Sequence, residues 1–130
     1  MEPVHVLYDR DCGICRTIVG GLLTWDRAGR LRPVEIQSPE GRELLAGMDE
    51  EQRLDSWHLA GPSGVDSAGA AFPDLFEVLP GGTPLAELTR RAPGISERAY
   101  RLLAGNRSKV SKLVPDALRD RADGVIARRR

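Results

Sequence analysis

Residues 4–23 read VHVLYDRDCGICRTIVGGLL, and this stretch decides the fold. Its first five residues are almost continuously apolar, which is typical of a buried β-strand. A polar connection follows at residues 9–11. From Cys15 onward, apolar residues recur at spacings of three and four, which indicates one face of an amphipathic helix. The stretch therefore predicts a strand that runs into a helix, with a Cys-x-x-Cys motif at the junction.

Further strands and a series of helices are expected after this unit. The first helix and its two flanking strands would form a βαβ unit with a right-handed crossover. The additional strands are predicted at residues 31–36, 56–60 and 65–67. A short helix is predicted after the cap Ser38-Pro39, and another from residue 68 onward. A third is predicted to begin at Thr83-Pro84, with Leu85 and Leu88 facing inward. The remaining helices are expected to begin near Ser96 and to cover residues 108–114 and 115–128.

Cys12 and Cys15 are the two cysteines of the chain, and so short a loop gains little from a structural crosslink. On the first turn of a helix, their spacing suits a disulfide that opens and closes. Zinc wants about four ligands, and the chain has neither a second cysteine pair nor a zinc-finger histidine pair. The pattern predicts a redox pair at a βα junction and a thioredoxin-like α/β fold, with an inert pair as an alternative.

The position of each cysteine predicts its role. Cys12 is expected at or just before the start of the helix, where unpaired amides and the helix dipole stabilise a thiolate. It is the predicted nucleophile, and the more buried Cys15 is the predicted resolving thiol. Electrons would pass through the sulfur atoms alone, so neither a metal nor an organic cofactor is expected.

Four charged residues flank the thiols and are candidate modulators. Asp9 and Asp11 oppose a thiolate by their like charge, whereas the two nearby arginines favour it. Asp9 would either accept a proton from the second thiol or pair with Arg10 or Arg16. Asp11 would either lie near the thiols or cap the helix.

His58, on the predicted third strand, also has two interpretations. It would face the thiols and shuttle protons, or it would be hydrogen-bonded within the sheet. The sequence alone leaves both open.

Several segments resemble the DCC-type thiol-disulfide oxidoreductase family, which is named for its Asp-Cys-x-x-Cys start. The resemblance covers about residues 4–110 and rests on YDRDCGIC (8–15), GRLR (29–32), QS (37–38), SWHL (56–59), AYRL (99–102) and NR (106–107). It implies a thioredoxin-like fold and exchange with a disulfide or thiol substrate and a reductant. Members of this family are mostly small bacterial proteins.

The chain departs from the related patterns at two places. Arg10 stands where the family usually has glycine, and it brings a cation close to the thiols. Thioredoxin-like proteins usually have a cis-proline before the third strand, where it shapes a peptide-binding groove. Here residues 54–56, LDS, occupy that place.

Charge is divided unequally along a chain whose formal net charge is zero. Residues 1–94 carry 9 Lys and Arg against 15 Asp and Glu, a net charge of −6. Residues 95–130 carry 10 against 4, a net charge of +6. We interpret the first segment as a thioredoxin-like body and the second as a basic helical extension packed on the same domain.

The basic extension allows a second hypothesis. The chain would then be a redox-inactive module whose tail docks an acidic partner, a membrane surface or nucleic acid. No stretch approaches the roughly 20 apolar residues of a membrane span. The start MEPVH lacks the pattern of a secretory signal, so a cytoplasmic location and a resting dithiol are expected.

Overall fold

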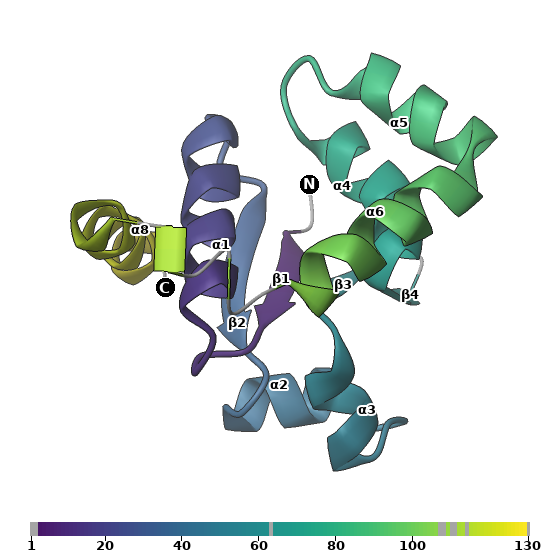
Figure 1. Ribbon diagram of the computed structural model, residues 1–130. Coiled ribbons are helices and arrows are strands. Elements are labelled where there is room, and N and C mark those ends of the chain that lie inside the picture. Colours follow the sequence, from purple (N-terminus) through teal and green to yellow (C-terminus); the bar gives the residue numbers. More distant parts are fainter. Residues whose placement is uncertain (1–2, 63, 107–108, 110–111, 114, 130) are drawn as a thin grey trace.

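The structure is a computed structural model that describes residues 3–62, 64–106, 109, 112–113 and 115–129. It consists of a four-stranded sheet with helices on both faces, followed by further helices (Figure 1). In chain order the elements up to the hairpin are β1 (Val4–Tyr8), α1 (Gly13–Trp25), β2 (Leu31–Glu35), α2 (Pro39–Leu44), α3 (Glu50–Asp55), β3 (His58–Gly61) and β4 (Gly64–Ser67). The elements that follow are the 3₁₀ turn η1 (Ala68–Ala71) and helices α4 (Phe72–Val78), α5 (Thr83–Arg91), α6 (Pro93–Gly105) and α8 (Asp116–Arg129).

The sheet has the strand order β2-β1-β3-β4, with β1 parallel to β2 and the other two pairs antiparallel. Alternate residues of β1 divide the core between its two faces. Val6 and Tyr8 pack with α1 and α4, whereas Leu7 packs with Leu45, which follows α2. This βαβ unit followed by a hairpin and a helix is a thioredoxin-like fold with extra C-terminal helices, which confirms the fold class predicted from the sequence.

Polar side chains cap the start of two short helices, and the first of these caps was predicted from the sequence. Ser38 caps α2 by accepting a hydrogen bond from the amide of Gly41, with Pro39 in the first turn. A reciprocal capping box between Asp49 and Gln52 begins α3. None of the described helices combines the length and apolar character that a membrane span requires.

One expectation for the C-terminal helices is wrong. Leu85 and Leu88 of α5 are 41% and 61% exposed, and the small Ala86 is buried in their place. The helix begins at Thr83 without a side-chain cap, because Gly82 is its N-cap residue. The helix expected over residues 108–114 falls largely outside the described residues.

Helix α8 packs along α1 on the side away from the sheet (Figure 1). Gly20 allows this close approach, because a Cβ built on it would lie 2.5 Å from the Cβ of Ala122. Gly20 faces α8, and nothing lies within 4 Å of a Cβ built on Gly21.

An ion pair fixes the far end of the same interface. The fully buried carboxylate of Asp26 accepts a hydrogen bond from Arg129 Nη1 at 2.9 Å. It also accepts from the amide of Leu31 at 2.8 Å. Arg129 Nη2 donates in addition to the carbonyls of Leu23 and Asp26. The last turn of α8 is thereby tied to the end of α1.

The two neighbouring glycines of α1 provide a matched pair of substitutions. We expect Gly20→Ala to lower the free energy of unfolding by about 1–3 kcal/mol, because the added methyl overlaps α8. Gly21→Ala should raise it by about 0.5–1 kcal/mol, because alanine favours the helix and the site is open. Urea denaturation measures both, and equal effects of the two substitutions would contradict this packing.

The Asp26–Arg129 pair gives a second expectation for stability. Arg129→Met should destabilise the fold by about 3–5 kcal/mol, because it leaves a buried carboxylate without its cation. Adding Asp26→Asn should recover part of that loss, because the buried charge is then removed as well. Arg128→Met, at the exposed neighbouring position, is the control and should change stability by less than about 0.5 kcal/mol. A double variant as unstable as the single one would argue against a charge effect.

Candidate active site

The two cysteines lie where the chain leaves β1 and enters α1. Cys12 is the N-cap residue of α1, and Cys15 lies one turn into the helix. Both are half-buried free thiols, and their Sγ atoms lie 2.7 Å apart. The predicted position of the motif at the strand-to-helix junction is confirmed. The two sulfur atoms are therefore close enough to react with each other after a small rearrangement.

The start of α1 presents backbone amides beside Cys12. The first amides of a helix have no partner within the helix, and they carry its positive end. The first turn of α1 contains no acidic residue that would offset this field. The alternative that Asp11 caps the helix is wrong, because Cys12 holds the N-cap position and no side-chain cap is present. The exposed carboxylate of Asp11 instead lies 3.9 Å from Arg10 Nε.

Asp9 organises the loop between β1 and α1. Its Oδ1 accepts hydrogen bonds from the amide of Asp11 at 2.9 Å and from Gln37 Nε2 at 2.7 Å. Gln37 Oε1 in turn accepts from the amide of Arg10 at 3.2 Å. The expectation that Asp9 pairs with an arginine is wrong, because Gln37 takes that place. Gln37 follows β2, and parallel neighbours such as β1 and β2 end at the same edge of the sheet.

The two arginines near the motif are engaged by other groups. Arg10 Nη1 lies 3.9 Å from a carboxylate oxygen of Glu35. Arg16 Nη1 donates to the carbonyl of Arg10 at 2.8 Å, and its Nε lies 3.2 Å from a carboxylate oxygen of Asp123 in α8. Their favourable effect on a thiolate stays a prediction.

A third arginine, which the sequence did not point to, lies over the motif. A Cβ built on Gly13, between the two cysteines, would lie 3.7 Å from Arg119 Nε. Arg119 belongs to α8, which reaches this place by packing along α1. No local pattern near the cysteines could have indicated a residue so distant in sequence.

His58 lies on the other face of the sheet from α1. It is directly opposite Leu7 in the β1–β3 register, and Leu7 belongs to the core on the α2 side. His58 Nε2 lies 2.9 Å from the carbonyl oxygen of Arg53, so Nε2 must carry the proton and donate. Nδ1 then accepts from the hydroxyl of Ser67 at 2.6 Å. The structure thus places His58 in a hydrogen-bonded position within the fold and away from the thiols.

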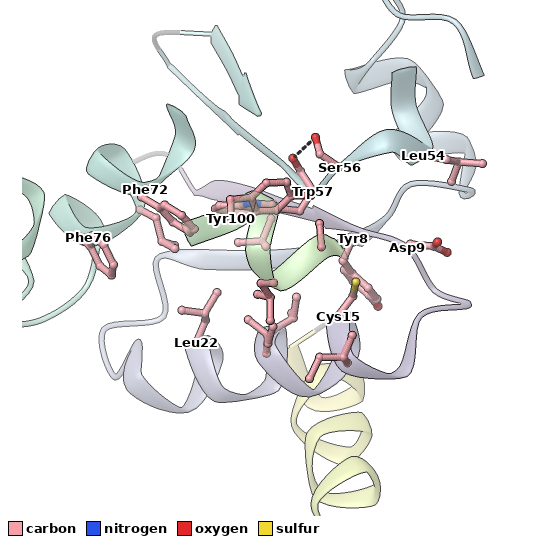
Figure 2. A pocket seen from close by; sticks show the side chains of 17 residues that line it. Tyr8, Asp9, Cys15, Leu22, Leu54, Ser56, Trp57, Phe72, Phe76 and Tyr100 are labelled. Carbon is pink, nitrogen blue, oxygen red and sulfur yellow. Dashed lines mark hydrogen bonds between the residues drawn. The ribbon is translucent and has the colours of Figure 1, made fainter. Parts of the chain in front are cut away.

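An apolar cavity of about 170 Å³ adjoins the motif (Figure 2). Its walls come from β1, α1, α4, α6 and the connection between α3 and β3. Cys15 lies on the α1 wall, and Asp9 borders the cavity from the loop. Leu54 and Ser56 line it from the LDS segment that stands in place of the proline of related folds. The described residues contain no cis peptide bond.

The surroundings of the motif supply groups suited to sulfur chemistry. Within the described ranges, no three side chains of His, Cys, Asp or Glu gather in a way that could hold a metal ion. What the site offers is a close pair of thiols, a helix start that stabilises a thiolate, and an apolar cavity. Such a site is able to exchange disulfides.

Comparison with known families agrees with a site for thiol-disulfide exchange. Residues 6–113 match the DCC1-like thiol-disulfide oxidoreductase family, and the chain belongs to that family. The match covers the β1–α1 junction with both cysteines and every residue that lines the cavity. Searches of curated proteins and of solved structures found no match. The family supports a general role in thiol-disulfide exchange.

The buried His58 predicts a pH dependence of stability. Burial lowers the pKa of His58 below its ordinary value of 6.5, against the opposing effect of the Arg53 carbonyl. The unfolded chain takes up a proton on this residue as the pH falls below about 6.5, whereas the native state resists it. The contribution of neutral His58 to the free energy of unfolding is therefore fully present above about pH 6.5 and is lost progressively as the pH falls below that value.

Urea denaturation between about pH 7 and about pH 5 measures this effect. We expect His58→Gln to flatten the decline of stability toward acid relative to the unchanged chain. The matched control His5→Gln should leave that decline in place. Parallel profiles for His58→Gln and the unchanged protein would contradict the assignment.

Proposed function

We propose that Cys12 and Cys15 form a redox-active dithiol that reduces a disulfide substrate, with Cys12 as the nucleophile and Cys15 as the resolving thiol. The observation that carries the proposal is the 2.7 Å separation of the two Sγ atoms at the start of α1. Membership of the DCC1-like thiol-disulfide oxidoreductase family supports it.

The first step is an exchange at Cys12. Its thiolate attacks one sulfur of the substrate disulfide, so that a mixed disulfide forms and the substrate S–S bond breaks. The first product leaves as a thiolate and takes a proton from water. The start of α1 favours this step, because the positive end of the helix stabilises the attacking thiolate.

The second step is resolution by Cys15. After Cys15 loses its proton, its sulfur attacks Cys12 Sγ, and the mixed disulfide breaks. The second product leaves as a thiolate and is protonated in its turn. Two electrons have then passed from the cysteine pair to the substrate, and the pair is a disulfide. A thiol reductant restores the dithiol by the reverse exchange.

The basic C-terminal segment fits a supporting role in this site. Arg129 is paired with Asp26, Asp123 pairs with Arg16, and Arg119 lies over Gly13. We propose that residues 95–130 belong to the same domain as residues 1–94 and help to hold the active-site helix. In the alternative hypothesis of a redox-inactive module, the positive charge of this segment binds an external partner. The contacts of Arg119 and Arg129 instead direct part of that charge toward the body of the protein itself.

Replacing the cysteines one at a time tests the proposed roles. We expect Cys12→Ser to lower turnover of a model disulfide, bis(2-hydroxyethyl) disulfide, to the uncatalysed rate, because the attacking sulfur is absent. Cys15→Ser should accumulate a mixed disulfide on Cys12, because the resolving sulfur is absent. Turnover is measured as the rate at which the model disulfide is reduced, with dithiothreitol as the reductant. The mixed disulfide is detected from the intact mass of the Cys15→Ser variant.

The two serine variants control for each other, since both remove one sulfur and change the fold little. Urea denaturation should show that both remain folded. Turnover by Cys12→Ser at the rate of the unchanged protein would refute the role of Cys12. A mixed disulfide that accumulates on Cys15 in Cys12→Ser, with none on Cys12 in Cys15→Ser, would reverse the two roles.

A further inference from the structure

The cavity beside Cys15 is placed to hold part of a substrate. It lies on the α1 side of the sheet, and α6 covers it with Tyr100, Leu103 and Ala104 (Figure 2). Cys15 lines the cavity, and its Sγ lies 2.7 Å from Cys12 Sγ, so a group bound in the cavity sits beside Cys15 and close to the nucleophile.

The walls of this cavity suit an apolar group. Trp57, Phe72 and Phe76 form a row of rings with centroid separations of 5.6 and 6.1 Å. None of the described residues that line the cavity is Lys, Arg or His, and Asp9 is the charged residue at its border. An anionic substituent would lose its hydration here without gaining a cation, whereas an apolar one gains by leaving water.

The size of the cavity limits the group that it takes. Its volume is about 170 Å³. An apolar protein cavity of about 150 Å³ is large enough for benzene. The space therefore fits one aromatic ring or a branched chain of similar size, and the row of aromatic walls favours a ring that packs against their edges and faces.

Resting on the proposed function, we propose that this cavity is the substrate subsite and that it takes the ring-sized apolar substituent of a low-molecular-weight disulfide. Attack by Cys12 on the sulfur that carries this substituent forms the mixed disulfide and releases the other half as a thiol. Cys15 then attacks Cys12 Sγ, and the apolar thiol leaves the cavity as the second product.

The surrounding elements favour a small molecule over a protein segment. Helix α6 forms one wall of the cavity, and the border toward β3 is formed by Leu54 and Ser56 at the end of α3. β3 itself lies between β1 and β4, so its backbone is paired on both sides. An extended chain would therefore find no free edge of β3 to pair with beside the cavity.

A matched pair of substrates tests this inference. Reduced protein is mixed in single turnover with bis(2-hydroxyethyl) disulfide or with the mixed 2-hydroxyethyl 2-phenylethyl disulfide. Loss of both protein thiols gives the rate constant for each substrate. Dividing it by the rate constant of free N-acetylcysteine with the same substrate removes the intrinsic reactivity of that disulfide. We expect the phenylethyl compound to react about tenfold faster or more, because its ring enters the cavity.

Two variants of α6 locate the effect in the cavity. Ala104→Phe fills it and should reduce the preference for the phenylethyl compound to about one. Ala99→Phe, at an exposed position of the same helix, is the matched control and should keep the preference. Leu103→Ala enlarges the cavity and should shift the preference toward a 2-naphthylethyl substituent, which provides a gain of function that misfolding would not produce.

The possible failures are distinguishable. Equal rates for both substrates would overturn the subsite and leave the proposed function standing. No reaction with either substrate would overturn the proposed function, and the subsite with it. A preference retained by Ala104→Phe would place the ring elsewhere. Faster reaction with insulin than with the phenylethyl compound would overturn the assignment to a low-molecular-weight substrate.

Discussion

Helix α1 is held along its length and at its far end, and this constraint sets where the two sulfur atoms lie. The β-sheet supports one side, and α8 packs on the other through the contact at Gly20. At the C-terminal end, Arg129 binds the buried carboxylate of Asp26 and two carbonyls of α1 and its cap. A shift of the helix along its axis would break these contacts together, so the start of α1 and its cysteines stay in register with β1.

The cysteine pair separates two unlike environments. On one side, the polar loop is organised by Asp9, whose Oδ1 binds the amide of Asp11 and Gln37. On the other side, Cys15 lines an apolar cavity with aromatic walls. The polar side and the helix start favour a charged thiolate, whereas the apolar side favours an uncharged substituent. Together these environments would admit a disulfide by its apolar end and release charged thiolates toward water.

The local parts of this arrangement could be predicted from the sequence. The apolar run of β1, the helical spacing of α1 and the Ser38-Pro39 cap each arise from neighbouring residues, and each is present in the structure. Cys12 could be placed at the helix start for the same reason. The face of His58 follows from strand alternation only once its register with Leu7 is known.

The remainder depends on contacts between residues far apart in the chain. Gln37 takes the place expected for an arginine because the ends of β1 and β2 meet. Arg119 reaches the cysteine motif only because α8 packs along α1. In α5 the pattern of leucines predicted the wrong face, because the small Ala86 is the residue that fits the interface.

The most direct test of the central claim is the reversible oxidation of the pair. The protein is equilibrated with mixtures of oxidised and reduced dithiothreitol and, separately, with mixtures of oxidised and reduced glutathione, which are less reducing, and is analysed by intact mass and thiol content. We predict one two-electron transition in which both thiols disappear together and the chain loses the mass of two hydrogen atoms without gaining an adduct. Thiols that persist at every ratio, or that are lost only through adducts and dimers, would contradict the account.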